Sequence, residues 1–214
     1  MKYLFLDTSS FYINIALIDD DKIIYKFKER NSPKLSENIF VYLEYAFKKS
    51  KIKKEDLDKI FIVNGPGSFT GVRVGLTIAK TMAWALKIPV IPLSTLELYA
   101  TTETQFKYII SYINDRNGYL YAGIYDKELN NYMIDRYLHI SELLDKITSF
   151  KNFIMIGYNE IKIDQKTIQP EIDIIKIIKK HESDKLGDVH LLKPNYLKMI
   201  DAERKILKQK KEQD

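Results

Sequence analysis

The chain has 214 residues, of which 45% are hydrophobic and 12% aromatic; this suffices for one large or two small packed cores and excludes an intrinsically disordered chain. Its 34 Lys and Arg against 29 Asp and Glu give a net charge of +5, which permits a nucleic-acid partner without requiring one. The absence of Cys excludes disulfides, thiolate metal sites and cysteine nucleophiles, and none of the three His forms a helical metal-binding pair, so we assign no metal site.

The first half of the chain is predicted to fold as a meander followed by alternating helices and strands. Apolar runs at 2–6, 12–18 and 22–28, divided by polar turns, predict three antiparallel strands. Apolar residues at helical spacing predict a helix over 35–49. The elements predicted next are a buried strand at 59–63, a glycine loop, a helix over 70–86, a strand at 90–91 and a helix begun by the capping box Ser94-Thr95-Leu96-Glu97. The order is therefore β-β-β-α-β-α.

The second half is predicted to repeat this order. Its predicted elements are strands at 107–113, 119–125 and 131–138, a helix from Ser141, a strand at 153–156 and then mixed helical sequence. Two such copies predict an α/β protein of the actin and sugar-kinase (ASKHA) superfamily, with two ribonuclease-H-like subdomains, each a mixed sheet with flanking helices. We place the boundary near Gln105, so that residues 1–105 form the N-terminal subdomain and 106–214 the C-terminal subdomain, which ends in a basic helix over 204–211.

No targeting or membrane segment is visible. The apolar run at the N-terminus is too short for a signal-peptide core, and no stretch approaches the ~20 apolar residues of a membrane span. We expect a soluble cytoplasmic protein without a membrane partner. The lysine-rich stretches at 48–54 and 205–211 are typical of solvated faces, although both could touch a phosphate backbone.

The turn after the first strand holds the weak nucleotide-site candidates Asp7, Thr8 and Ser9. In nucleotide-binding members of the superfamily an acidic residue and a phosphate loop stand at this place. A phosphate loop normally includes Gly, and none occurs between Met1 and Val63. The alternative is a polar turn whose side chains bond the local backbone.

The glycine loop is the most distinctive segment. It joins a buried strand to a helix, where free backbone N–H groups could hold an anion, yet it lacks the Gly-Lys-Ser/Thr ending of a P-loop. The alternative is a tight connection in which Ser68 or Thr70 caps the helix. The residues of the motif are Gly65, Pro66, Gly67, Ser68, Phe69, Thr70, Gly71, Arg73 and Gly75. No nucleophile motif accompanies the His residues, so no catalytic residue is assigned.

Two helices are candidates for a partner interface. In the helix over 70–86, small residues recur every four positions and allow another backbone to approach closely. In the helix over 35–49, aromatic residues extend beyond the core stripe, and aromatics are enriched at interfaces. The candidate interface residues are Phe40, Val41, Tyr42, Tyr45, Gly71, Gly75 and Ala79. The alternative is that both helices are covered within the chain.

The string GPGSFTGVRVG at 65–75 closely resembles the signature of the bacterial TsaB (YeaZ-like) family. The resemblance spans most of the chain in order. Weaker matches are Leu6-Asp7-Thr8, Ser36-Glu37, Ser94-Thr95-Leu96, Asp115-Arg116-Asn117-Gly118 with Tyr121, and Pro194 with Tyr196-Leu197.

This resemblance implies a non-catalytic subunit that pairs with TsaD to install threonylcarbamoyl on adenosine 37 of tRNAs reading codons that begin with A. It further implies the ATPase TsaE as a partner, tRNA and ATP met through the complex with no cofactor bound tightly, and a possible homodimer when alone. Whether the chain touches tRNA or nucleotide directly stays open. Two alternatives stay open: a nucleotide-binding ASKHA enzyme, or a glycoprotease-like peptidase, each acting alone.

Overall fold

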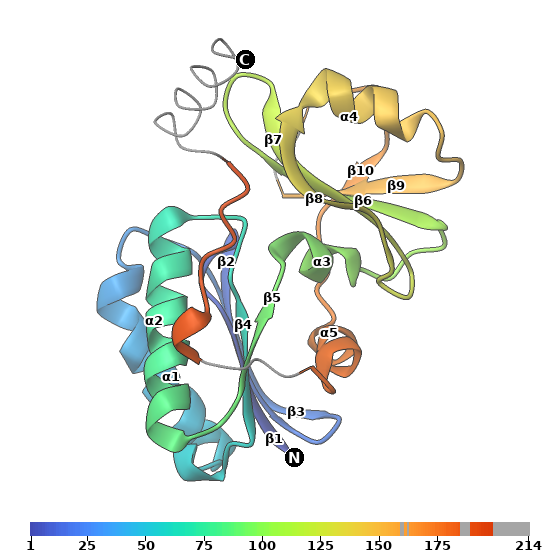
Figure 1. Ribbon diagram of the computed structural model, residues 1–214. Coiled ribbons are helices and arrows are strands. Elements are labelled where there is room, and N and C mark those ends of the chain that lie inside the picture. The colour runs from blue at the N-terminus through green and yellow to red at the C-terminus, as the bar shows by residue number, and fades with distance from the viewer. Residues whose placement is uncertain (159–160, 162, 185–188, 199–214) are drawn as a thin grey trace.

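Two five-stranded mixed sheets, one from each half of the chain, form the framework of the protein (Figure 1). This computed structural model describes residues 1–158, 161, 163–184 and 189–198. The strands of the first sheet, in spatial order, are β3 (Lys22–Arg30), β2 (Tyr12–Asp19), β1 (Lys2–Asp7), β4 (Lys59–Val63) and β5 (Val90–Leu93). β1 pairs antiparallel with β2 and parallel with β4, so the sheet changes direction at its centre.

Both faces of the first sheet are covered. Helices α1 (Leu35–Ser50) and α2 (Phe69–Leu86) lie on one face, and a 3₁₀ turn, η1 (Lys54–Asp56), leads into β4 (Figure 1). On β1 the side chains alternate: Leu4 and Leu6 pack toward α1 and α2, whereas Tyr3 and Phe5 point to the other face. Helices α3 (Thr95–Ala100) and α5 (Ile174–His181) contribute to the core on that face.

The second sheet repeats the order of the first, as the sequence predicts. Its strands, in spatial order, are β10 (Thr167–Ile168), β9 (Phe153–Ile156), β6 (Tyr108–Asn114), β7 (Tyr119–Asp126) and β8 (Asn131–His139). Helix α4 (Ile140–Ile147) packs on one face. The other face shares a continuous core with the first sheet through α3, because Leu96 and Leu98 of that helix cluster with residues of both sheets. α3 therefore fastens the two subdomains together.

After α5 the chain returns to the first subdomain in residues 189–198, which we call the return segment (red in Figure 1). Its 3₁₀ turn η2 (Val189–Leu191) packs beside α2, where the Lys80 ammonium donates to the carbonyl oxygens of His190 and Leu192. Its far end pairs with the second subdomain, because Lys198 Nζ lies 2.7 Å from Asp115 Oδ2. The boundary near residue 105 stays a prediction, and the return segment shows that residues after it also pack against the first subdomain.

The predicted strands and helices up to residue 156 are confirmed, with ends that differ by a few residues at most. Helix α5 lies in the stretch predicted as mixed helical sequence, and β10 and η2 are elements that the sequence did not predict. The basic helix expected over 204–211 lies outside the described residues. No helix in the described part of the chain is both long enough and apolar enough to cross a bilayer.

Candidate functional site

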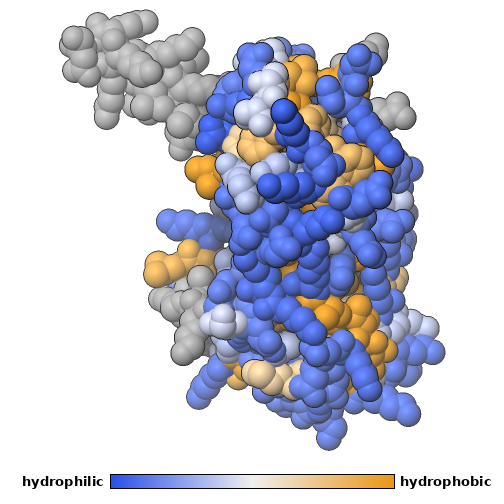
Figure 2. All heavy atoms as spheres, turned by 90° about the vertical axis from the view of Figure 1, so that its right-hand side faces the viewer, coloured by the Kyte–Doolittle hydropathy of each residue, from blue (hydrophilic) through white to orange (hydrophobic). Residues whose placement is uncertain are grey.

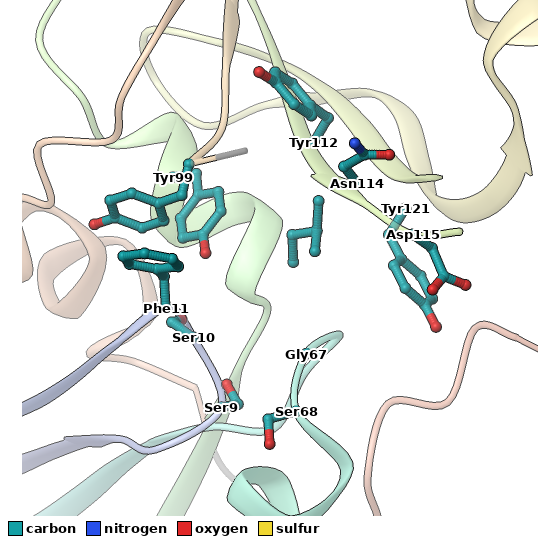
Figure 3. A pocket seen from close by; sticks show the side chains of 12 residues that line it. Ser9, Ser10, Phe11, Gly67, Ser68, Tyr99, Tyr112, Asn114, Asp115 and Tyr121 are labelled. Carbon is teal, nitrogen blue, oxygen red and sulfur yellow. The ribbon is translucent and has the colours of Figure 1, made fainter. Parts of the chain in front are cut away.

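A cleft of about 320 Å³ opens between the two subdomains (Figure 3). The β1–β2 turn and the glycine loop form its floor, and α3, the end of β6 and β7 form its walls. Its lining residues are Ser9, Ser10, Phe11, Gly67, Ser68, Tyr99, Tyr112, Ile113, Asn114, Asp115, Tyr121 and Tyr158. Two of the sequence-predicted groups, the turn after β1 and the glycine loop, thus meet at one cavity.

Asp7 is fully buried and engaged by its own turn. One carboxylate oxygen, Oδ1, accepts from the amides of Ser9 and Ser10 at 3.0 and 3.1 Å and from the Ser9 hydroxyl at 3.0 Å. The other oxygen accepts from Asn14 Nδ2 at 3.3 Å. Burial raises the pKa of Asp7, although these hydrogen bonds oppose the shift. The geometry corresponds to the polar-turn interpretation, because the carboxylate serves local backbone and side-chain donors.

The glycine loop docks directly on this turn. The Ser68 amide donates to the Ser9 carbonyl oxygen at 2.9 Å, and the Thr8 hydroxyl donates to the Gly71 carbonyl oxygen at 2.7 Å. Ser68 caps α2, accepting from the Gly71 amide at 3.2 Å, as one of the sequence interpretations expects. Gly65 has a φ of +110°, a backbone conformation that L side chains rarely adopt. The signature string therefore closes the loop onto β1 through backbone contacts.

The small-residue stripe of α2 faces inward, which corrects part of the predicted interface. Gly71, Gly75 and Ala79 are all buried within the chain. A Cβ on Gly71 would overlap the Thr8 carbonyl oxygen, and one on Gly75 would lie 3.0 Å from Ile62 Cδ1 and overlap the Thr8 hydroxyl. The stripe allows α2 to approach β1 and β4, so these three residues cannot meet a partner while this packing holds.

The predicted aromatic residues of α1 divide into two groups. Phe40 is 65% exposed and Val41 is similarly open, so neither belongs to the core of the chain. Tyr42 is partly buried against Phe27 of β3, with ring centroids 4.5 Å apart. Tyr45 is half exposed and meets β3 edge to face. The interface role of these four residues stays a prediction, and the most exposed pair is Phe40 and Val41.

Sequence reasoning missed two features of the site. Trp84 of α2 is 66% exposed on the helix layer that carries Phe40. Its exposure could not be predicted, because α2 is apolar on nearly all sides and the sequence does not show which side faces solvent. Phe11 stacks on Tyr158 with ring centroids 5.1 Å apart, and Tyr99 meets Tyr158 edge to face at 5.4 Å. These rings come from distant parts of the sequence, and only the tertiary fold brings them to the cleft. Burial raises the pKa of Tyr99 and of Tyr158.

The described residues contain no group of three or more His, Cys, Asp or Glu side chains able to hold a metal ion. The three His lie apart: His139 caps α4, His181 ends α5 and His190 lies in η2. In the described part of the chain, the cleft is therefore lined by hydroxyl, amide and aromatic groups, with Asp115 as its carboxylate.

Solved structures share this architecture. An uncharacterized protein from Pseudomonas aeruginosa, described as similar to peptidase YEAZ, superposes with a TM-score of 0.75 at 18% identity, covering 92% of this chain and 99% of its own. YeaZ from Pseudomonas aeruginosa gives a TM-score of 0.73 at 17% identity, covering 91% and 100%. The class is thereby defined: the fold is the two-subdomain fold of the ASKHA superfamily.

Sequence comparison narrows the class to a family. The model of the family TsaD, tRNA N6-adenosine threonylcarbamoyltransferase, matches residues 29–193. The tRNA threonylcarbamoyladenosine biosynthesis protein TsaB of Bacillus subtilis is 28% identical over 229 residues, covering 99% of this chain and all of its own. TsaB of Escherichia coli is 28% identical over 133 residues, covering 61% of this chain and 57% of its own. The chain belongs to the TsaD family, within its TsaB (YeaZ-like) branch.

Proposed function

We propose that this protein is the non-catalytic partner of a TsaD-type transferase in the threonylcarbamoylation of adenosine 37 in tRNAs reading codons that begin with A. Membership of the family and the printed names of its relatives support a role in this modification. We propose in addition that the protein binds TsaD, that it has no catalytic activity of its own, that the tRNAs are those reading codons that begin with A, and that it acts in the cytoplasm. TsaE completes the assembly in the same proposal.

The observation that carries the proposal is the exposure of large apolar side chains on both helices that cover one face of the first sheet. Phe40 and Val41 of α1 and Trp84 of α2 each expose well over half of their surface. Large apolar side chains in water mark a surface that another protein covers, and Trp and Phe supply much of the energy of such contacts. By contrast, the face shown in Figure 2, which is the right-hand side of Figure 1, is mostly hydrophilic with small separate apolar groups.

The engagement of the β1–β2 turn supports the accessory role. The Asp7 carboxylate and the hydroxyls of Thr8 and Ser9 are already committed to hydrogen bonds within the chain. Binding a phosphate or a metal there means breaking those bonds, at ~1 to 3 kcal/mol for each buried group left unpaired. We propose that ATP is met through the assembled complex, and that no cofactor is held tightly by this chain alone.

The test is affinity for the cognate TsaD, measured by titration calorimetry, with light scattering to count subunits. Phe40→Glu is expected to weaken the heterodimer by a few kcal/mol, as loss of a central interface residue does. The matched control is Ile134→Glu on β8, where an apolar side chain that is 69% exposed receives the same charge. Equal affinity of wild type and Phe40→Glu, or equal weakening in the control, would contradict the proposed surface.

In the absence of TsaD, we propose that the same surface pairs two copies of this chain. Light scattering of the isolated protein is then expected to give twice the mass of a monomer, and the Phe40→Glu variant is expected to give the mass of a single monomer. A dimer that survives Phe40→Glu would place the self-contact elsewhere.

A further inference from the structure

The edge strand β3 carries a row of cations on one face. Lys26, Lys28 and Arg30 alternate along the strand, and all three are exposed. Lys26 lies opposite Ala16 and Lys28 opposite Asn14 in the ladder, which puts the row on the face away from α1 and α2. Alternate residues of a strand are ~6.6 to 6.8 Å apart, so the row presents charges at regular intervals.

The charges of the row are not neutralised by ion pairs. Among the described residues, none of the three cations lies within ion-pair distance of a carboxylate. Partial desolvation and then the Lys28 ammonium lower the pKa of Lys26, and the Asp173 carboxylate opposes the shift. Like charges at this spacing repel one another weakly. A bound polyanion would relieve that repulsion.

Aromatic rings hold two of the three charged groups in place. Lys28 Nζ lies 4.4 Å from the centroid of the Tyr12 ring, and Arg30 Cζ lies 5.0 Å from that of Phe11. Phe11 is itself fixed by stacking on Tyr158. Cation–π contacts of this kind restrict long side chains, so less conformational entropy is lost when an anion binds.

The Arg30 end of the row opens on a cavity of about 540 Å³ between the start of α1 and the start of α2. Arg30, Ser32 and Thr70 line it, and the first turn of α2 contains no acidic residue. Ser10, which is buried, also borders this cavity. Arg30 and the positive end of the α2 dipole thus border the same cavity.

We propose that the cation row of Lys26, Lys28 and Arg30 binds the phosphate backbone of RNA, and that it is a direct contact to the tRNA. This inference rests on the proposed function, which supplies an RNA substrate. Regularly spaced, pre-positioned and unneutralised cations match the repeated charge of a phosphate backbone. The Tyr12 and Phe11 rings beside the row already contact the cations, and Phe11 also stacks on Tyr158. These rings are therefore not free to stack on bases, and we expect the row to bind the phosphate backbone without preference for base sequence.

The test uses fluorescence anisotropy of a labelled tRNA, titrated with the protein at several KCl concentrations, alone and with TsaD. In the triple variant Lys26→Gln/Lys28→Gln/Arg30→Gln, affinity at low salt is expected to fall at least tenfold. The slope of log affinity against log salt should lose about 2 to 3, since each phosphate contact contributes ~0.7 to 0.9. The conservative variant Lys26→Arg/Lys28→Arg should bind as wild type does.

The matched control is Lys127→Gln/Lys146→Gln/Lys151→Gln, which removes the same net charge from exposed lysines of the second subdomain. Equal loss in the control would mean that only overall charge matters and would overturn the proposal. Unchanged binding in the β3 variant would do the same, leaving these cations as ordinary protection of an edge strand. Competition by polyglutamate or anionic vesicles as effective as that by unlabelled tRNA would reassign the row to another polyanion.

Failure here is distinguishable from failure of the proposed function. The row lies on the sheet face opposite α1 and α2, so the triple variant should keep the wild-type affinity for TsaD and the wild-type melting temperature. Lost tRNA binding with TsaD affinity intact supports the inference, and retained tRNA binding overturns it alone. If the wild-type protein does not bind TsaD, the proposed function is overturned, whatever the result of the RNA titration.

Discussion

Gly71 and Thr8 are in direct contact: the Thr8 hydroxyl donates to the Gly71 carbonyl oxygen, and a Cβ on Gly71 would lie 2.9 Å from the Thr8 carbonyl carbon. The turn after β1 therefore meets α2 at positions where the helix carries no side chain. This contact explains why small residues line one side of α2, and it fixes the floor of the cleft.

Gly71→Ala should lower the free energy of unfolding by ~1 to 3 kcal/mol, because the added methyl group overlaps backbone that cannot move aside. In an exposed helix the same change would stabilise by ~1 kcal/mol, so the sign of the effect is diagnostic. Urea denaturation measures it. Thr77→Ala, at an exposed position of the same helix, is the control and should change little. A Gly71→Ala protein as stable as wild type would refute the close approach.

The isolated chain should not bind ATP with a dissociation constant in the low micromolar range or below. The Asp7 turn offers no glycine, and its polar groups are occupied by the chain itself. Calorimetric titration of ATP with Mg²⁺ into the purified protein measures this directly. Tight binding by the chain alone would favour the alternative of a nucleotide-binding enzyme.

His181 should make stability depend on pH. Its Nε2 lies 2.9 Å from Glu97 Oε1 and its Nδ1 lies 2.6 Å from Asp184 Oδ2, so α5 is tied to α3. The hydrogen bond to Glu97 is the main cause that raises the pKa of His181 above its ordinary value of 6.5. A raised pKa means that the folded state favours the protonated ring, so this stabilisation is complete below pH 6.5 and is lost as pH rises through the folded-state value.

His181→Gln should therefore cost ~1 kcal/mol at pH 6 and less at pH 8. Thermal or urea unfolding across this range measures the difference, and Glu97→Gln should flatten the same part of the profile. Parallel pH profiles for wild type and His181→Gln would show that the pair does not titrate as described.

Tyr196→Ala should loosen the return segment while leaving the fold intact. The Tyr196 hydroxyl accepts from Arg73 Nε at 2.9 Å, and its ring stacks on Phe69. Next to it, the Asn195 amide donates to the Asn64 carbonyl oxygen at 2.9 Å. Hydrogen exchange should become faster for that amide, with a change of less than ~1 kcal/mol in global stability. Tyr132→Ala on β8 is the control, and unchanged exchange at Asn195 would contradict the anchoring role.

Local signals predicted most of the fold, because strands and helices up to residue 156 follow clear hydrophobic periods, and the cap at Ser68 follows from its residue type. The direction of the α2 stripe could not be predicted: small residues every four positions suit a partner or a neighbouring strand equally, and only the position of Thr8 decides. The bounds of α5 were not predicted because its helical pattern of paired isoleucines and lysines extends over only eight residues. The packing of the return segment could not be predicted, because apart from η2 it has no regular structure and therefore no hydrophobic periodicity.

The return segment has a consequence for how each molecule is made. Synthesis proceeds from the N-terminus, and all five strands of the first sheet are available once Leu93 has left the ribosome. Yet Leu192, which is buried in the core beneath α1 and α2, is translated about a hundred residues later. The core of the first subdomain in a nascent chain thus keeps a gap until Leu192 has emerged from the ribosome, and a chain terminated before that residue would retain the gap.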